Sequence, residues 1–538
     1  MSEIERRGSW DAIREAHSWV LPPDYNLAWD MVGKWARAAP DRLALIHLDA
    51  EDRVHELSYG EMDRRAARLA NVLSAAGLGE GDRIAVLLPQ CPEVLLTHLA
   101  AYRLGAIVVP LFTLFGVDGL DYRLRHSGAR MLVTDRANLP KIAEIRDGLG
   151  ELSRIFCIDG AEAGAEALGR LMEAASDRQT PVATGPETPA FISYTSGTTG
   201  PPKGALHGHR VLLGHLPGVQ LTHEFFPQPG DRMWTPADWA WMGGLCNIAM
   251  PSLRFGVPLL AHRMERFDPE RAFRLMERLE IRNVFLPPTA LKLMRRVERP
   301  ERFSLALRSV GSGGESLGAE LLDWGRAALG LTINEFYGQT ECNLVLGNCA
   351  SILPVRPGSM GRAFPGSRVA ILDEEGREAR PGTPGEIAIH KGDAAMFLGY
   401  WTAPDKTAEK FAGDWMLTGD EGVMEPDGYF RFASRTDDVI TSSGYRIGPT
   451  EIEHCLTGHP AVAMAAVIGV PDPVRTEVVK AFVTLAPGQE PSEELAAALI
   501  AHVRLRLSPH LAPREVAFLD QMPITATGKI RRRDLRGR

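Results

Sequence analysis

Short apolar runs alternate with helical segments along this chain, and this alternation limits the fold more than any other feature of the sequence. Downstream of residue 83 the pattern predicts strands at 84–88, 107–110 and 131–134, with a helix at 93–104 between the first two. Strands that alternate with helices in this way form a parallel sheet with helices on its faces. We therefore predict an α/β fold for this part of the chain.

A second alternation of the same kind lies downstream, and a different pattern follows it. The downstream unit is expected to contain strands near 233–236, 257–261, 283–287 and 309–313, and a helix at 269–279. Beyond Pro357 the chain becomes a series of short apolar runs separated by Gly and Pro turns, which predicts a small β subdomain. A chain of 538 residues is too long for one hydrophobic core, so several packed units are expected.

Composition and charge exclude several functional classes. The formal net charge of −8 argues against nucleic acid as the main partner. Six cysteines are spread along the chain without CxxC spacing, so we expect neither a zinc site nor a disulfide framework, and a cytoplasmic location fits. The longest apolar stretch, 94–115, is interrupted by His98, Arg103 and Pro110, and the first ten residues are charged. Neither segment predicts a membrane span or a signal peptide.

A run rich in glycine and threonine follows the apolar segment 190–194, which is predicted to be a short buried strand. Glycines let backbone N–H groups approach a ligand, and the hydroxyl groups and one lysine add donors and charge. Convergent donors with one cation suit a phosphate group. The candidate phosphate-binding residues are Thr195, Ser196, Gly197, Thr198, Thr199, Gly200 and Lys203. Their spacing differs from a Walker A motif, and the alternative interpretation is a flexible hairpin tip.

The run 194–204 resembles the signature loop of the adenylate-forming (AMP-binding) superfamily, and later motifs in the family's order extend the resemblance to the acetyl- and medium-chain acyl-CoA synthetases. The resemblance implies ATP, Mg2+, coenzyme A and a small carboxylic acid as the molecules bound. It also implies two domains. The large N-terminal domain, 1–435, would contain two α/β subdomains and the small β subdomain, and a small mobile α+β domain would occupy 436–538.

The segment 334–341, Asn-Glu-Phe-Tyr-Gly-Gln-Thr-Glu, is expected to lie at the end of an apolar strand at 331–333. Tyr337 offers a ring on which a base can stack, Thr340 a hydroxyl for phosphate, and Glu341 a hard oxygen ligand for Mg2+. Taken alone, a glutamate after a strand is usually solvated. The segment resembles the second nucleotide motif of the family, in which these residues have those roles, Thr340 and Glu341 being catalytic.

Other motifs complete the resemblance. The loop 313–316 is similar to the adenine-side loop of the family, its ordinary alternative being a β–α turn. Asp420, predicted on a turn, can accept hydrogen bonds from both ribose hydroxyls. A long cation at Lys529 can reach the reacting phosphate and carboxylate. The residues so implied are Gly314, Glu315 and Ser316 for adenine, Asp420 and Arg435 for ribose, Arg446 for the α-phosphate, Asp437 as hinge, Lys529 for catalysis, and Ser443 and Gly444 for coenzyme A.

The acyl pocket is predicted from 237–244, which is similar to the acyl-pocket motif of acetyl- and medium-chain acyl-CoA synthetases. Trp234 and Trp239 fit ordinary core, and Trp241 is the expected wall. Acetate-selective relatives carry a tryptophan immediately before Gln-Thr-Glu, where this chain has Gly338. The missing indole is expected to leave room for more carbons, each adding roughly 0.8 kcal/mol on burial. The candidate pocket residues are Trp241, Gly313 and Gly338.

The expected reaction converts a short- to medium-chain, branched or aryl acid, rather than acetate, to its acyl-CoA through an acyl-adenylate. No carrier-protein domain follows Lys529 in the sequence, which favours coenzyme A as the acceptor. One alternative is a stand-alone adenylation enzyme that passes the acyl group to a carrier protein. A second is a non-enzymatic nucleotide-binding relative, which would be expected to lack Lys529, Glu341 or Asp420, and all three are present.

The spacing of Pro523, Gly528 and Lys529 is similar to the acetylation site of bacterial acyl-CoA synthetases. A lysine acetyltransferase and a deacetylase that act on Lys529 are therefore expected partners. Acetylation would remove the charge that adenylation needs. The alternative is that the spacing serves catalysis alone.

Overall fold

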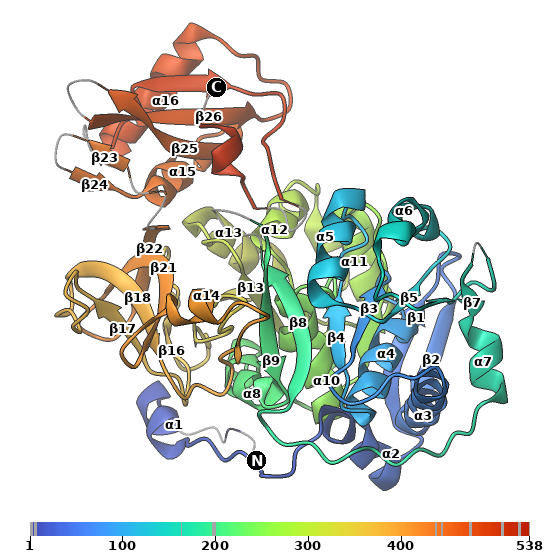
Figure 1. The fold of residues 1–538 in the computed structure, drawn as a ribbon. Coiled ribbons are helices and arrows are strands. Elements are labelled where there is room, and N and C mark those ends of the chain that lie inside the picture. Colours follow the sequence, from blue (N-terminus) through green and yellow to red (C-terminus); the bar gives the residue numbers. More distant parts are fainter. Residues whose placement is uncertain are drawn as a thin grey trace.

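The computed structural model describes residues 4, 8–162, 164–195, 201–435, 438, 440–442, 445–472, 476–506, 511–525 and 529–536. At 435, 441, 445, 446, 451 and 476 only the backbone is described. These parts of the chain form four β-sheets with helices between and around them. Figure 1 shows a large body from the N-terminus to β22 (Phe430–Arg435), with the C-terminal elements standing on one side of it. The predicted α/β class is confirmed.

The first large sheet contains the predicted downstream strands. Its central strands are parallel, and antiparallel pairs close both of its edges. In spatial order the described strands are β16 (Arg362–Ala363), β15 (Leu346–Gly347), β14 (Asn334–Tyr337), β13 (Ser309–Gly313), β12 (Asn283–Phe285), β10 (Met233–Trp234), β11 (Leu259–Ala261), β1 (Leu43–Leu48) and β2 (Val54–Ser58).

The prediction of a strand at 331–333 is wrong. Pairing with β13 begins only at Asn334, opposite Gly311. Gly330, at φ 70°, ends the preceding helical turn in the left-handed region, which glycine adopts without steric cost. The residues 331–333 form the connection between that turn and β14.

The second large sheet contains the upstream alternation and the strands on both sides of the glycine-rich run. Its inner strands are parallel, and β9 and β19 add an antiparallel edge. In spatial order the described strands are β19 (Gly399–Tyr400), β9 (Lys203–Gly208), β8 (Pro189–Thr195), β4 (Ile107–Pro110), β3 (Arg83–Leu87), β5 (Met131–Thr134), β6 (Arg154–Cys157) and β7 (Glu166–Ala167).

One hydrophobic core lies between the two large sheets. It joins side chains of both sheets to the helices α3 (Tyr59–Ala75), α4 (Pro92–Arg103), α8 (Val211–Thr222) and α10 (Met250–Phe255). A second core covers the outer face of the first sheet with α11 (Pro269–Arg278), α12 (Pro288–Met294) and α13 (Ala319–Trp324). A third covers the outer face of the second sheet with α5 (Val117–Ser127) and α6 (Leu139–Ile145). The two sheets therefore share buried apolar surface, which fixes their relative position.

Local sequence signals set the starts and ends of these helices. The Ser58 hydroxyl accepts a hydrogen bond from Glu61 N (3.2 Å) at the start of α3, and the Ser58–Glu61 spacing is that of a capping box. Asp268 caps α11 in the same way. Gly256 ends α10 in the left-handed region. Shorter helices connect the layers: α1 (Trp10–Ala16), α2 (Lys34–Ala38), α7 (Leu168–Ala174), α9 (Met242–Gly244) and α14 (Pro404–Ala408).

The predicted small β subdomain lies beside the two large sheets. Its described strands are β17 (Val369–Leu372), β18 (Pro384–His390), β21 (Trp415–Met424), β20 (Phe411–Ala412) and β22, all paired antiparallel. The ten-residue β21 is longer than the sequence pattern indicates. It brings Asp420 to the edge of the candidate site.

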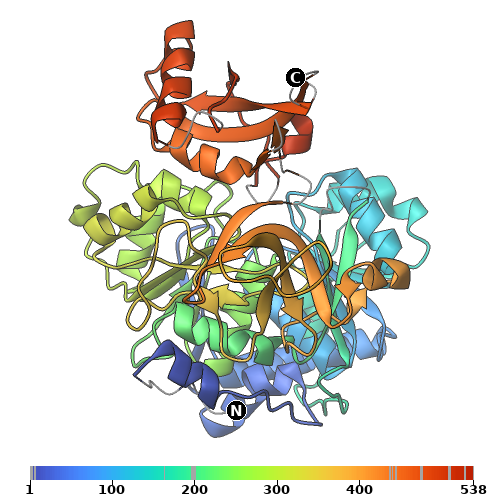
Figure 2. The same ribbon diagram turned by 90° about the vertical axis from the view of Figure 1, so that its left-hand side faces the viewer.

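The C-terminal unit is α+β. Its described strands are β24 (Tyr445–Ile447), β23 (Ile440–Ser442), β26 (Thr476–Leu485), β25 (Val462–Asp472) and β27 (Glu515–Phe518). The helices α15 (Pro449–Thr457) and α16 (Glu493–Arg506) pack on one face through their own hydrophobic core. Figures 1 and 2 both show this unit above the large body, joined to it after β22. The exact boundary between the two predicted domains, at 435/436, remains a prediction.

Among the described residues, no helix has both the length and the hydropathy needed to cross a bilayer.

Candidate active site

The two ends of the glycine-rich run are held by strands. Thr195 at the end of β8 lies opposite Lys203 at the start of β9. The Tyr122 hydroxyl donates to the Pro202 carbonyl (2.9 Å), so α5 fixes the return of the loop. The predicted residues Ser196, Gly197, Thr198, Thr199 and Gly200 lie outside the described residues. The structure thus places the ends of the predicted phosphate loop at the edge of the second sheet.

Glu341 contacts β19, the edge strand that pairs with β9 in the second sheet. It is buried, and the Tyr400 hydroxyl donates to its Oε1 atom. Thr340 precedes it at a half-buried position, with its backbone beside His207. Burial lowers the pKa of His207 to about 3, so this imidazole is neutral at pH 7. Of the predicted phosphate and metal residues, Lys203, Thr340 and Glu341 therefore lie in one neighbourhood.

Asp420 and Tyr337 are directly bonded. The Tyr337 hydroxyl and the Gln339 amide nitrogen both donate to Asp420 Oδ2, each over 2.6 Å. Gln339 also donates to the Thr418 carbonyl (2.8 Å). The predicted base-stacking ring and the predicted ribose carboxylate thus form one hydrogen-bonded group.

The prediction that Asp420 lies on a turn is wrong. The residue lies inside β21, which pairs with β18 and β22. A β-bulge separates the pairs at Leu417 and Glu421, and Gly419 within it has φ 73°. A bulge turns a strand side chain out of the regular alternation. This local irregularity allows a strand residue to face Tyr337.

The adenine-side loop leaves the end of β13. Gly314 has φ 97°, and a Cβ atom there would lie 3.3 Å from the Trp241 ring. Glu315 is partly exposed, with its carboxylate 4.0 Å from the Lys292 ammonium. Ser316 is half-buried. These contacts place Trp241 against the predicted nucleotide loop.

Trp241 belongs to a row of aromatic rings. Its centroid lies 5.7 Å from that of Phe285, which lies 5.4 Å from that of Phe336. Trp241 is half-buried, whereas Trp234 and Trp239 are fully buried in the cores. The expectation that only Trp241 of the three can form a pocket wall agrees with this burial.

The argument that Gly338 leaves open space is wrong. A Cβ atom at this position would lie 2.3 Å from Leu344 N and 2.7 Å from Asn343 Cα, so main chain fills the volume. A Cβ at Gly313 would lie 2.6 Å from the Phe336 ring. Both glycines are required by close packing. Neither supplies empty volume for an acyl chain in the direction that a side chain would take.

Lys529 reaches the same place from the C-terminal unit. Its Cε atom lies 4.0 Å from the Cβ position built on Gly314, next to the Trp241 ring. Its backbone N–H donates to the Thr525 hydroxyl (3.0 Å), and its carbonyl accepts from Thr525 N (2.7 Å). A lysine more than two hundred residues away in sequence thus lies at the adenine-side loop.

The contact between the two units extends beyond Lys529. His454 in α15 interacts with the Ser316 backbone and lies near Glu320 and Lys292. Burial in this contact lowers the pKa of His454. Two described segments of the C-terminal unit therefore approach the same loop.

The remaining predicted residues are only partly described. Asp437, Ser443 and Gly444 lie outside the described residues. The backbone of Arg435 pairs with Asp420 across β22 and β21, and that of Arg446 pairs with Thr441. The strand pairing places Arg435 next to the ribose candidate, but the structure does not describe its side chain.

Four residues of the site were missed by sequence reasoning: Gln339, Phe285, Phe336 and Tyr400. Gln339 lies inside the nucleotide motif 334–341, and its polar side chain is a signal by which the sequence could have identified it. The two phenylalanines look like ordinary strand residues. Tyr400 lies 59 positions from Glu341 in sequence, and no local pattern connects the two.

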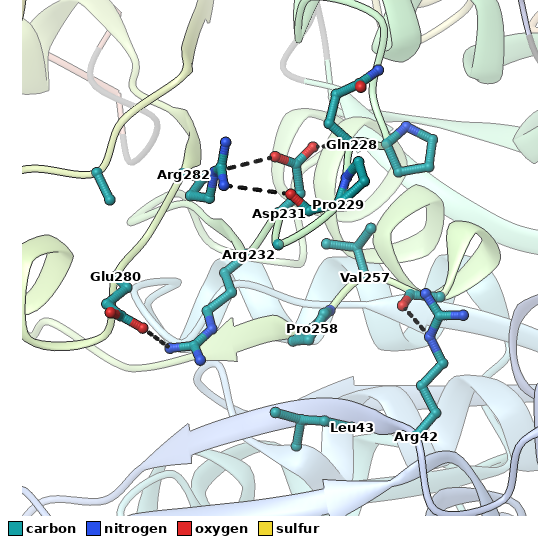
Figure 3. A pocket seen from close by; sticks show the side chains of 14 residues that line it. Arg42, Leu43, Gln228, Pro229, Asp231, Arg232, Val257, Pro258, Glu280 and Arg282 are labelled. Carbon is teal, nitrogen blue, oxygen red and sulfur yellow. Dashed lines mark hydrogen bonds and ion pairs between the residues drawn. The ribbon is translucent and has the colours of Figure 1, made fainter.

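The pocket in Figure 3 lies at the opposite ends of the strands. It is lined by the residues that precede β10, β11 and β12, among them Arg232, Pro258 and Arg282. Arg232 lies 3.3 Å from the Glu280 carboxylate, and Arg282 lies 3.7 Å from that of Asp231. Ligands of open α/β sheets bind at the carboxyl ends of the strands. None of the described lining residues is a candidate site residue, so this pocket is separate from the site.

Comparison with known proteins gives consistent matches over nearly the whole chain. Residues 32–401 match the AMP-binding enzyme family, and residues 451–529 match the AMP-binding enzyme C-terminal domain. The mitochondrial acyl-coenzyme A synthetase ACSM3 of Mus musculus is 33% identical, covering 98% of this chain and 93% of that protein.

Solved structures agree with these matches. A Brucella canis acyl-CoA synthetase is 37% identical with a TM-score of 0.76, covering 98% of both chains. The anthranilate CoA ligase AuaEII, solved with anthranoyl-AMP, is 28% identical with a TM-score of 0.89, covering 96% of this chain and 97% of that one.

Proposed function

The chain belongs to the AMP-binding enzyme family, and we propose that it joins a short- to medium-chain, branched or aryl carboxylic acid to coenzyme A at the expense of ATP. The enzyme class is that of an ATP-dependent acid–CoA ligase. The observation that carries the proposal is the meeting of Lys529, Gly314 and Trp241. A lysine that the C-terminal unit brings beside Gly314, which Trp241 also contacts, supports a role for this cation at the predicted nucleotide loop and acyl wall.

In the first step a carboxylate oxygen of the acid attacks the α-phosphorus of ATP. The new P–O bond forms as the bond to pyrophosphate breaks, which gives an acyl-adenylate. Lys529 supplies positive charge where the carboxylate and phosphate oxygens meet, and Lys203 does so at the phosphate loop. Tyr337 and Asp420 hold the nucleoside. In the second step the sulfur of coenzyme A attacks the acyl carbon, AMP leaves, and the thiol proton passes to solvent.

The residues present fit an Mg2+–nucleotide complex. Mg2+ in such sites is usually held by one or two carboxylates together with substrate phosphates and water. Among the described residues, no group of three metal-binding side chains is found. Next to the predicted phosphate loop, the acidic side chain is the buried carboxylate of Glu341. Glu341 would hold the ion, and a bound ion would offset charge on the phosphate oxygens.

Support for the acid class comes from the aromatic row and from the relatives. Trp241 and Phe285 offer flat apolar surface for an alkyl chain or a ring. One structural relative is an anthranilate CoA ligase. The experiment is a pyrophosphate-release assay with acetate, butyrate, hexanoate, isobutyrate and benzoate. A higher kcat/KM for acetate than for all the others would contradict the proposed acid class.

The acceptor is tested separately. With the best acid of this panel, AMP release should require coenzyme A and yield the acyl-CoA. Release of acyl-adenylate without coenzyme A dependence, with transfer to an added carrier protein, would favour the stand-alone adenylation alternative.

The two steps need different groups at one site, so we also propose that the C-terminal domain presents Lys529 for adenylation and then rotates about Asp437 to present Ser443 and Gly444 to coenzyme A. Asp437→Pro restricts φ at the hinge. It should damage thioester formation more than adenylation. Equal losses in both steps would contradict the hinge assignment.

A further inference from the structure

We propose that Tyr400 is a positioning residue for nucleotide and Mg2+ binding, which orients the Glu341 carboxylate and fixes its distance from Lys203. The inference rests on the proposed function of the site. It extends that function to a residue outside the motifs from which the site was predicted.

The backbone around Tyr400 is bonded to both partners. In the second sheet Tyr400 lies opposite Ala205 of β9, the strand that begins at Lys203. Leu398 N donates to the Leu206 carbonyl and Trp401 N to the Gly204 carbonyl, each over 2.7 Å. Three residues before Tyr400, Phe397 N donates to the Glu341 carbonyl (2.7 Å). The segment 397–401 therefore joins the return of the phosphate loop to the turn that carries Glu341.

The hydroxyl of Tyr400 donates to Oε1 of Glu341, and both side chains are buried. A hydrogen bond from a phenol to a carboxylate is charge-assisted and directional. It limits rotation of the carboxyl group. Among the described residues, no donor is bonded to the other oxygen, Oε2. Tyr400 therefore orients Oε1, while Oε2 remains available to a hard cation.

The ring of Tyr400 has a second contact. The Lys203 ammonium lies 5.2 Å from the ring centroid, within the range of a cation–π interaction. One side chain thus contacts the cation that closes the phosphate loop and the carboxylate that would hold Mg2+. The ammonium contacts the ring of Tyr400 and the carboxylate contacts its hydroxyl, so one phenol contacts both charged groups.

A purely structural role is the alternative. Tyr400 packs in the core of the β subdomain, with its ring centroid 5.0 Å from that of Phe397. A packing role needs the ring but not the hydroxyl. Tyr400→Phe keeps the ring, its packing and its contact with Lys203, and it removes the hydroxyl that is bonded to Glu341.

The chain contains a matched control. Tyr429 is also buried, its hydroxyl donates to the Pro354 carbonyl (2.8 Å), and the Arg356 guanidinium lies 3.7 Å from its ring centroid. It therefore has the same two kinds of contact as Tyr400, away from the candidate site. Tyr429→Phe measures what loss of a buried tyrosine hydroxyl does to the protein in general.

The experiment measures binding of AMP-CPP, in which a methylene group replaces the α–β bridging oxygen that the reaction cleaves, by calorimetry at several Mg2+ concentrations. For Tyr400→Phe the Mg2+ concentration at half-saturation should rise about tenfold, as expected for loss of a charge-assisted hydrogen bond. Affinity for the analogue without Mg2+ should change less than twofold, and Tyr429→Phe should behave as wild type. An unchanged Mg2+ dependence in Tyr400→Phe would overturn the proposal, as would an equal change in both variants.

A double-mutant cycle with Glu341→Gln supplies the second measurement. If Tyr400 acts through Glu341, the effect of Tyr400→Phe on Mg2+ dependence should disappear in the Glu341→Gln background. Additive effects would overturn the proposal. The binding assay needs no acid and no turnover, so the outcomes are distinguishable. A wild-type protein that binds no Mg2+–nucleotide contradicts the proposed function, whereas normal wild-type binding with no effect of Tyr400→Phe contradicts only this inference.

Discussion

The nucleotide half of the candidate site and the half that carries Lys529 are built in different ways. In the large body Tyr337, Gln339 and Asp420 are already bonded to one another. Lys529, by contrast, is exposed, and its backbone is bonded to the hydroxyl and the backbone N–H of Thr525. The nucleotide half of the site is fixed by strands of the large body. The position of Lys529 depends on how the C-terminal unit is docked against that body.

This difference assigns different tasks to the two halves. A site that is bonded before the ligand arrives loses little entropy on binding and therefore suits recognition of the nucleotide. A cation delivered by a separate unit can be present for one step and absent for another. The rigid half should control affinity for ATP, and the delivered half should control the rate of adenylation.

The largest expected effect comes from removing the delivered cation. Lys529→Gln should slow acyl-adenylate formation about 1000-fold, because a positive charge at the reacting oxygens is lost. Thioester formation from supplied acyl-adenylate should change by less than about threefold. Single-turnover assays of each half-reaction measure the two rates.

The control for this prediction is Lys480→Gln, a lysine in β26 whose ammonium lies 2.7 Å from the Glu515 carboxylate. It should leave both half-reactions near wild type. Adenylation by Lys529→Gln within a few-fold of wild type would contradict the catalytic role and the proposed control by acetylation. Mass spectrometry of the protein from cells tests whether Lys529 is acetylated.

The next effect concerns the ion-pair cluster that supports the Lys529 segment. Arg532 donates to Glu453 (2.7 and 2.8 Å) and to Asp438 (3.1 Å), which lies next to the predicted hinge. Arg532→Ala leaves two largely buried carboxylates without this partner and should cost the C-terminal domain about 2 to 3 kcal/mol of stability. Adenylation should fall with it, while affinity for ATP stays unchanged.

Chemical denaturation and calorimetry measure these two quantities. Arg531→Ala is the matched control, because Arg531 forms an exposed pair with Asp534 (2.6 Å) and such pairs contribute little. A loss of ATP affinity in Arg532→Ala that equals its loss of adenylation would show that the two halves of the site are not separable.

A smaller effect is expected in the rigid half. Asp420→Asn keeps the volume but removes the charge that accepts from Tyr337 and Gln339. The Kd for ATP should rise about tenfold, consistent with loss of hydrogen bonds to a charged acceptor. The rate of adenylation at saturating ATP should change less. Asp393→Asn, at a buried aspartate bonded to Ser367 (2.6 Å), is the control. An effect on rate without an effect on affinity would contradict the proposed division.

The smallest effect concerns Glu335 in β14, below the adenine-side loop. Its Oε1 accepts from Leu317 N (3.3 Å), and burial raises its pKa to about 8. Because the folded-state pKa is above the unfolded value near 4.5, the stability linked to this proton is complete at acid pH and is lost as the pH rises through 8. Tm should therefore fall between about pH 5 and pH 8, with little further change above that pH, and Glu335→Gln should reduce this fall by a few degrees.

Thermal melts at several pH values test this prediction. Glu378→Gln, at an exposed glutamate paired with Arg368, should leave the pH dependence of Tm unchanged. Parallel curves for wild type and Glu335→Gln would show that Glu335 is not the titrating group.

The sequence alone indicated which elements build the large body. Short runs of four or five residues, separated by helical segments, predicted β3, β4, β5, β11 and β13 near their observed positions. Prediction from the sequence failed where strand pairing, rather than the local sequence pattern, decides where a strand begins or ends. The segment 331–333 is apolar, but β14 begins at Asn334, where the neighbouring strand begins to pair with it. Likewise Asp420 follows a Thr-Gly pair typical of turns and yet lies in a bulged strand.

For the site, the sequence determined which chemical groups are available, because motif residues such as Glu341, Asp420 and Lys529 can be recognised without coordinates. The tertiary structure decided which of them meet. Only the fold shows that Tyr400 bonds to Glu341, that main chain fills the space beside Gly338, and that Lys529 lies at Gly314 and Trp241. The physical reason is that side-chain identity is local, whereas these contacts depend on strand pairing and domain docking between segments far apart in the chain.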